Sequence, residues 1–226
     1  YVDPNQSGQW ISTDLTIVNN VVDLVGVAGG TYDVVYLIDN TEPNCDSTRV
    51  QTLTVVEPFN PGTFNEPVVV CEGEDITIPL RDLLDDENDG GRWEEISTVL
   101  SKGDAFDAAA GTFATGGQIA GNYVFTYNFE GNIPCPDVLE IVEVIIEALP
   151  IADAGEGGEL TCDITAITIG GNSSSGSNYT YSWTIDRNGT QEEVATTATY
   201  DAGEPGTYIL TVTNTDNGCI DTDEVE

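Results

Sequence analysis

Five cysteines are the residues of this chain with the most distinctive chemistry, because a cysteine can form a disulfide or bind a metal ion. Four of them fall into two pairs at matching places of a repeated pattern, Cys71 with Cys135 and Cys162 with Cys219. A disulfide closing a loop of about 60 residues contributes roughly 4 kcal/mol to stability. Zinc is disfavoured, because the chain has neither a CxxC motif nor a histidine. The spacing therefore predicts two disulfides, Cys71–Cys135 and Cys162–Cys219, and an oxidising compartment.

Cys45 is the fifth cysteine and has no partner within this pattern. By the phase of the repeat, its counterpart would precede residue 1. The simplest interpretation is an excerpt of a longer array. The alternative that stays open is completion by another chain, through strand addition or through a disulfide to Cys45.

Acidic side chains are the second group that could do chemistry. Forty Asp and Glu face five Lys and Arg, for a net charge of −35. Ca²⁺ is bound by carboxylate and carbonyl oxygens, so two stretches are candidate calcium sites. The first is a loop that ends in glycines, with Asp82, Asp85, Asp86, Glu87 and Asp89. The second lies near a predicted module boundary, with Asp153 and Glu156. The alternative is a solvated, salt-adapted acidic surface.

The same composition argues against several classes of function. Without histidine, the Ser-His-Asp and Cys-His arrangements are excluded within this chain, and we expect no catalytic residues. Nucleic-acid binding requires Lys and Arg for the phosphates, and only five are present. No apolar run approaches the roughly 20 residues that span a bilayer, so we expect no direct membrane insertion.

β-Strands must position these side chains. A tryptophan, a Gly-x-Tyr that opens an apolar run, and a cysteine recur three times, and the apolar runs alternate with period two, as in 123–129. Further strands are expected at Val50–Val56 and Val138–Ile146, and helical turns only at 80–86 and 104–110. The recurring aromatic residues are expected in the core: Trp10, Trp93, Trp183, Tyr32, Tyr123 and Tyr208.

The repeat divides the chain into three predicted modules. Residues 1–58 are the C-terminal part of a truncated module, 59–149 a whole module, and 150–226 a module with an incomplete last strand. Short strands with the order Cys, Trp, Tyr, Cys favour an all-β fold of immunoglobulin-like sandwiches in a linear array. The Gly-x-Tyr is similar to a tyrosine corner, in which a tyrosine hydroxyl bonds to the backbone upstream.

The third module also resembles a known family, through the stretches 150–155 (PIADAG), 160–162 (LTC), 179–183 (YTYSW) and 206–208 (GTY). These are similar to PKD-like and related immunoglobulin-like repeats of large secreted Bacteroidetes surface proteins, including gliding-motility-associated adhesins. The second module fits through Cys71-Glu72-Gly73 and its own Gly-x-Tyr. The resemblance implies an extracellular β-sandwich array on a cell surface.

The resemblance also implies a modification site. In that phylum a short Asp-Ser/Thr motif marks O-glycosylation, and Asp46-Ser47-Thr48 matches it, with Ser47 as the acceptor.

The expected function is a structural or adhesive segment, a cell-surface stalk or an extracellular filament. Its expected partners are neighbouring modules or copies of itself, and Ca²⁺ is the one cofactor considered. The alternative is a glycan-binding accessory module of a secreted polysaccharide-degrading enzyme, with surface glycans as partners. Exposed aromatic side chains on one sheet face would favour that alternative.

Overall fold

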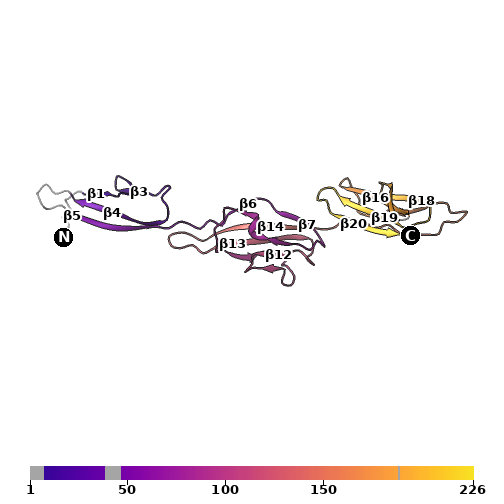
Figure 1. The fold of residues 1–226 in the computed structure, drawn as a ribbon, viewed down its shortest axis with the longest axis horizontal. Coiled ribbons are helices and arrows are strands. Elements are labelled where there is room, and N and C mark those ends of the chain that lie inside the picture. The colour runs from indigo at the N-terminus through magenta and orange to yellow at the C-terminus, as the bar shows by residue number, and fades with distance from the viewer. Residues whose placement is uncertain (1–7, 39–46, 188) are drawn as a thin grey trace. The chain divides into compact units, whose positions relative to one another are not determined.

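The computed structural model describes residues 8–38, 47–187 and 189–226, and their regular secondary structure is almost entirely β-strand (Figure 1). This confirms the all-β fold class. In these ranges the one helical element is the 3₁₀ helix η1 (Leu80–Leu83), within the predicted helical turn at 80–86. The turn predicted at 104–110 instead contains the short strand β11 (Phe106–Asp107). None of the described residues form a helix with the length and apolar character needed to cross a membrane.

The chain divides into two compact units that do not follow the predicted module boundaries. One unit comprises 1–61, 88–90 and 128–139, and the other comprises 62–87, 91–127 and 140–226. The boundaries at 58/59 and 149/150 therefore stay predictions. We refer below to 8–58, 59–149 and 150–226 as the first, second and third segments.

The first segment holds one antiparallel sheet and a hairpin. The sheet has the order β1 (Gly8–Ile11), β4 (Gly30–Ile38), β5 (Ser47–Val55), and the hairpin joins β2 (Thr16–Val18) to β3 (Val21–Asp23). Its buried side chains are Leu15, Val34 and Ile38. In the order of this sheet β5 is an edge strand.

The second segment is built from two sheets. The first has the order β10 (Arg92–Glu95), β13 (Gly121–Phe129), β14 (Val138–Glu147), β7 (Val68–Cys71), and β7 runs parallel to β14. The second sheet has the order β11, β12 (Thr112–Ala114), β8 (Thr77–Pro79). A small pair joins β6 (Thr63–Phe64) to β9 (Leu84–Asp85).

Aromatic rings from the two sheets of the second segment pack against each other. The ring of Phe113 on β12 lies 4.8 Å from that of Tyr123 and 5.1 Å from that of Phe125, both on β13. All three side chains are at most 1% exposed. The two sheets therefore form a β-sandwich around an aromatic core.

The third segment is also a sandwich. One sheet pairs β15 (Ile167–Gly170) with β18 (Thr199–Ala202). The other has the order β17 (Thr190–Ala195), β16 (Tyr179–Arg187), β19 (Tyr208–Asn214), β20 (Ile220–Val225). Buried residues from both sheets share one core cluster: Ala154, Ile169, Trp183, Ile185, Ala202, Tyr208, Leu210, Val212 and Val225. This strand order is that of an immunoglobulin-like fold.

The recurring tryptophans occupy equivalent strands. Trp93 and Trp183 lie in the cores of their sandwiches, at 9% and 0% exposure. Trp10 is half-buried on β1 and packs on Tyr36 of β4, with ring centroids 5.0 Å apart.

The recurring tyrosines form three tyrosine corners. Each hydroxyl donates to the backbone oxygen four residues earlier, at 2.8 Å for Tyr32 and 2.9 Å for Tyr123 and Tyr208. Tyr123 and Tyr208 are buried and Tyr32 is half-buried. The Gly-x-Tyr therefore fixes the start of the long central strand in each segment.

Candidate functional site

A disulfide joins Cys71 to Cys219, with an S–S distance of 2.07 Å and a Cα–Cα distance of 5.6 Å. Cys71 is the last residue of β7, and Cys219 immediately precedes β20. The bond spans 148 positions of the sequence, and it links the second segment to the third. The predicted pairs Cys71–Cys135 and Cys162–Cys219 are therefore wrong, and Cys135 and Cys162 are free thiols.

Strand direction explains why Cys71 and Cys135 do not pair. Cys71 lies opposite Glu147, the last residue of β14, whereas Cys135 precedes Val138, the first. The length of β14 at about 3.3 Å per residue puts roughly 30 Å between these positions. A disulfide requires Cα atoms within about 7 Å. The two cysteines of the second segment, Cys71 and Cys135, therefore lie near opposite ends of β14.

Backbone hydrogen bonds hold both halves of the disulfide in place. Beside Cys71, the N–H of Glu72 donates to the oxygen of Glu147 at 2.8 Å, which extends the β7–β14 pairing. The Cys219 oxygen accepts from the N–H of Asn214 at 2.9 Å, which closes the turn between β19 and β20. Cys219 is 1% exposed and Cys71 is half-buried. The β7–β14 pairing thus fixes the position of Cys71, and the turn between β19 and β20 fixes that of Cys219.

Carboxylates of β20 anchor the entry into the third segment. The backbone N–H groups of Ala152 and Ala154 donate to the carboxylates of Asp221 and Asp223, both at 2.8 Å. Charge-assisted bonds of this kind are stronger than neutral ones. The sequence did not single out these two acids, although they alternate along β20 so that both face one side.

The predicted calcium ligands do not come together. Glu87 forms an ion pair with Arg81 at 2.5 Å, and Asp85 accepts from Asn65 at 2.7 Å. Asp153 accepts from the N–H of Gly155, which folds its own loop. In the part of the chain that the structure describes, no three acidic or cysteine side chains converge on a metal position. The residues concerned are Asp82, Asp85, Asp86, Glu87, Asp89, Asp153 and Glu156.

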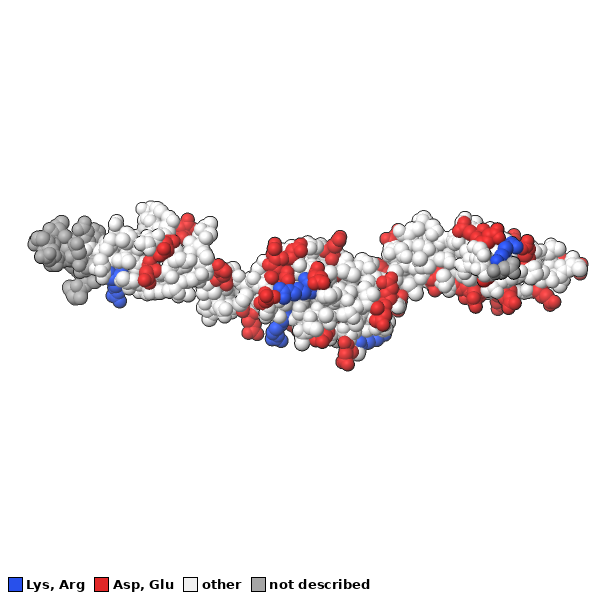
Figure 2. All heavy atoms as spheres, in the orientation of Figure 1, with Lys and Arg blue, Asp and Glu red and all other residues white. Residues whose placement is uncertain are grey.

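Acidic side chains are instead distributed over the surface, as Figure 2 shows for one face of each segment. The view contains few Lys and Arg, in keeping with the net charge of −35. Two other predicted positions lie outside the described residues: Cys45, and the side chain of Ser47, of which only the backbone at the start of β5 is described.

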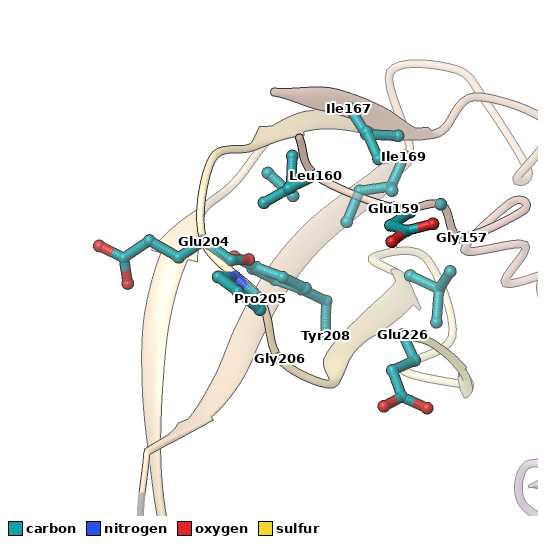
Figure 3. Close-up of a pocket in the computed structure, with 13 residues that line it drawn as sticks. Gly157, Glu159, Leu160, Ile167, Ile169, Glu204, Pro205, Gly206, Tyr208 and Glu226 are labelled. Atoms are coloured by element: carbon teal, nitrogen blue, oxygen red, sulfur yellow. The ribbon is translucent and has the colours of Figure 1, made fainter. Parts of the chain in front are cut away.

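A pocket of about 430 Å³ opens in the third segment (Figure 3). Its apolar wall includes Leu160, Ile167 and Tyr208, and Glu159 is also among its lining. The carboxylate of Glu204 points away from the pocket (Figure 3) and pairs with Arg187 at 2.8 Å. The lining contains no Ser, Thr, Cys, His or Lys, so it holds no Ser-His or Cys-His pair. The Tyr208 hydroxyl is already engaged by the backbone, and burial raises its pKa.

Fold and disulfide together define this chain as a series of immunoglobulin-like β-sandwiches with a covalent bond between two segments. No protein-family model matches the sequence. No curated protein matches it either.

Several solved structures of tandem domains are similar to the chain at low identity. Drosophila N-cadherin EC1-4 is 15% identical, with 100% of this chain and 68% of that chain covered and a TM-score of 0.31. An I-band fragment of titin is 10% identical, with 99% and 88% covered and a TM-score of 0.42. Extracellular domains 3–5 of Drosophila OTK are 12% identical, with 98% and 85% covered and a TM-score of 0.36. At this level no function is transferred from them.

Proposed function

We propose that this chain is a structural or adhesive segment of an extracellular stalk or filament, in which disulfides join successive β-sandwiches. The observation that carries the proposal is the Cys71–Cys219 bond between the second and third segments. Disulfides persist in oxidising compartments, which supports a location outside the cell. The acidic surface supports the same role, because like charge keeps neighbouring copies soluble and separate.

The position of the bond suits a chain under tension. When the two ends are pulled, force runs along residues 1–71, crosses the disulfide and leaves through 219–226. Residues 72–218 lie inside the covalent loop, and they include most strands of both sandwiches. These strands are therefore spared from extension while the bond is intact.

A covalent joint also couples the stability of the two sandwiches. In the chain-entropy model, closing a loop of 148 residues stabilises the folded state by about 5 kcal/mol. Loss of one sandwich leaves its unfolded chain tethered to the other at two points, the backbone link and the disulfide. We therefore infer that the second and third segments act as one mechanical unit.

Binding of glycans has less support from the surface. Among the described aromatic residues, Phe59 is the one with more than a third of its surface exposed, at 37%, and its ring stacks on Phe129 at 4.9 Å. A glycan platform requires several exposed rings on one face. Neighbouring modules or further copies of the chain are therefore the partners we propose.

Urea unfolding tests the proposed joint. The oxidised chain is compared with the double variant Cys71→Ser/Cys219→Ser, and the fluorescence of Trp93 and Trp183 reports on the two sandwiches. We expect the double variant to lose about 5 kcal/mol in total unfolding free energy. The matched control is Cys135→Ser/Cys162→Ser, which removes two cysteines that are not bonded in the structure.

Two results would contradict the proposal. One is equal stability of the oxidised chain and the Cys71→Ser/Cys219→Ser variant. The other is specific binding on a glycan array that a single surface aromatic substitution abolishes, which would favour the accessory-module alternative.

A further inference from the structure

The free thiol of Cys135 lies against the end of an edge strand. Its sulfur is 3.8 Å from the backbone oxygen of Val56, the residue that follows β5. Cys135 is half-buried, and its N–H donates to the oxygen of Asn132 at 2.6 Å, so a tight turn presents it there. This places a free thiol beside the backbone oxygen at the end of β5.

The same arrangement occurs around the disulfide, where it is complete. Val56 and Glu147 are equivalent in the repeat, since each precedes the next cysteine of the sequence, Cys71 or Cys162, by the same 15 positions. The Glu147 oxygen accepts from the N–H of Glu72, next to Cys71, and Cys71 bonds to Cys219. Cys135 thus stands at the end of β5 in the place that Cys219 takes at the end of β14.

The two sites differ in one respect: β14 is paired with β7, which ends in Cys71, whereas β5 has no such neighbour among the described strands. Along β14, the parallel strand β7 pairs Val68 to Val144 and Cys71 to Glu147. In the first segment β5 is at the edge of its sheet, and no described strand pairs with it on the side away from β4. An edge strand presents unpaired backbone groups that another strand can take up. A strand that paired with β5 as β7 pairs with β14 would therefore place its terminal cysteine opposite Val56.

We propose that Cys135 forms a disulfide with the cysteine of an apolar β-strand that adds in parallel to β5, and that this strand comes from another module of the same repeat. Cys162 holds the place of Cys71 in the third segment and is exposed, which suits it to donate the equivalent bond. In the repeat, each cysteine at the position of Cys71 then bonds to the cysteine at the position of Cys219 in the following module, as Cys71 does with Cys219. This inference rests on the proposed function, and it identifies the partner of the chain as another module of the same repeat.

The bond forms by thiol–disulfide exchange with a small disulfide as the oxidant. The donor cysteine first carries a small thiol as a mixed disulfide. The Cys135 thiolate then attacks the donor sulfur, a new S–S bond forms, and the small thiolate leaves with the electron pair of the broken bond. The proton lost from Cys135 is taken up by solvent.

The probe is a peptide with the sequence of residues 65–73, its cysteine activated as a mixed disulfide with thionitrobenzoate. It is added to the oxidised chain carrying Cys45→Ser, and peptide mapping measures the rates at Cys135 and at Cys162. The control peptide has the same composition with its residues scrambled around the cysteine. We expect the strand peptide to react about tenfold faster than the scrambled peptide at Cys135, and equally fast at Cys162. Equal rates of both peptides at Cys135 would overturn the proposal.

A second measurement does not depend on the chemistry of the thiol. In the Cys135→Ser variant, an excess of the unactivated strand peptide should slow amide hydrogen exchange in β5 and leave β19, which is paired on both sides, unchanged. Unchanged exchange in β5 would refute strand addition. Neither result bears on the Cys71–Cys219 joint, because the urea test of that joint changes Cys135 only in its control variant.

Discussion

Reduction of the Cys71–Cys219 bond should greatly lengthen the chain under tension. A pull on both ends of the oxidised chain extends residues 1–71 and 219–226, because residues 72–218 lie inside the covalent loop. After reduction, every residue becomes part of the extensible path. The change in contour length therefore reports directly which cysteines are bonded.

The magnitude follows from the reach of an extended chain, about 3.3–3.6 Å per residue. For the 148 positions that the bond spans, reduction adds about 500 Å of contour length. The fully stretched oxidised chain measures about 280 Å at the same reach. Disulfides within single modules, Cys71–Cys135 and Cys162–Cys219, would instead leave residues 136–161 extensible and give about 370 Å.

Single-molecule force spectroscopy on the chain held at both termini, with and without reductant, makes this measurement. The Cys135→Ser/Cys162→Ser variant is the control, and it should give the same two lengths as the unaltered chain. An oxidised length near 370 Å would refute the inter-segment bond. An unchanged length on adding reductant, with both sandwiches unfolded, would show that no disulfide shields the chain.

Three further outcomes are expected. Tyr208→Phe removes the hydroxyl that donates to the Glu204 oxygen at 2.9 Å, and should cost about 1 kcal/mol in urea unfolding. Burial raises the pKa of Tyr208 above 10.0, so the contribution of its neutral hydroxyl to stability is complete below pH 10 and falls as the pH rises through the folded-state pKa. Between pH 9 and 11 the Tyr208→Phe variant should therefore lose less stability than the unaltered chain. Gly170→Ala places a Cβ 2.6 Å from the Ala198 oxygen and should cost about 2–3 kcal/mol by calorimetry, whereas Gly189→Ala, also at positive φ but with nothing within 4 Å, should cost about 1 kcal/mol. Adding NaCl should raise the melting temperature as much as CaCl₂ of equal ionic strength, and a gain specific to Ca²⁺ would restore the calcium hypothesis.

The strands were predictable from the sequence because their signal is local. The alternation of Tyr123, Phe125, Tyr127 and Phe129 predicts the strand that the structure shows as β13 (Gly121–Phe129). The run predicted at 138–146 is β14 (Val138–Glu147). Burial of one face decides such patterns, and neighbouring residues suffice to detect it.

The cysteine pairing could not be read in the same way. The spacing between Cys71 and Cys135 recurs nearly unchanged between Cys162 and Cys219, which is equally compatible with bonds within modules and with bonds between them. The choice depends on the parallel pairing of β7 with β14, a contact between distant parts of the sequence. A tyrosine 11 to 13 residues before its cysteine, instead of the two residues of antibody domains, was the one local sign of a different bond.

The disulfide also holds the second and third segments together despite the repulsion between their negative charges. With a net charge of −35, neighbouring segments repel each other, and two carboxylates 10 Å apart in water do so by about 0.4 kcal/mol before screening. Salt screens this repulsion at physiological ionic strength, where the Debye length is about 8 Å, but much less at low ionic strength. A junction held by ion pairs or a bound cation would therefore change its stability with the medium. The Cys71–Cys219 bond does not depend on ionic strength, so a strongly acidic surface and a firm connection between segments can coexist.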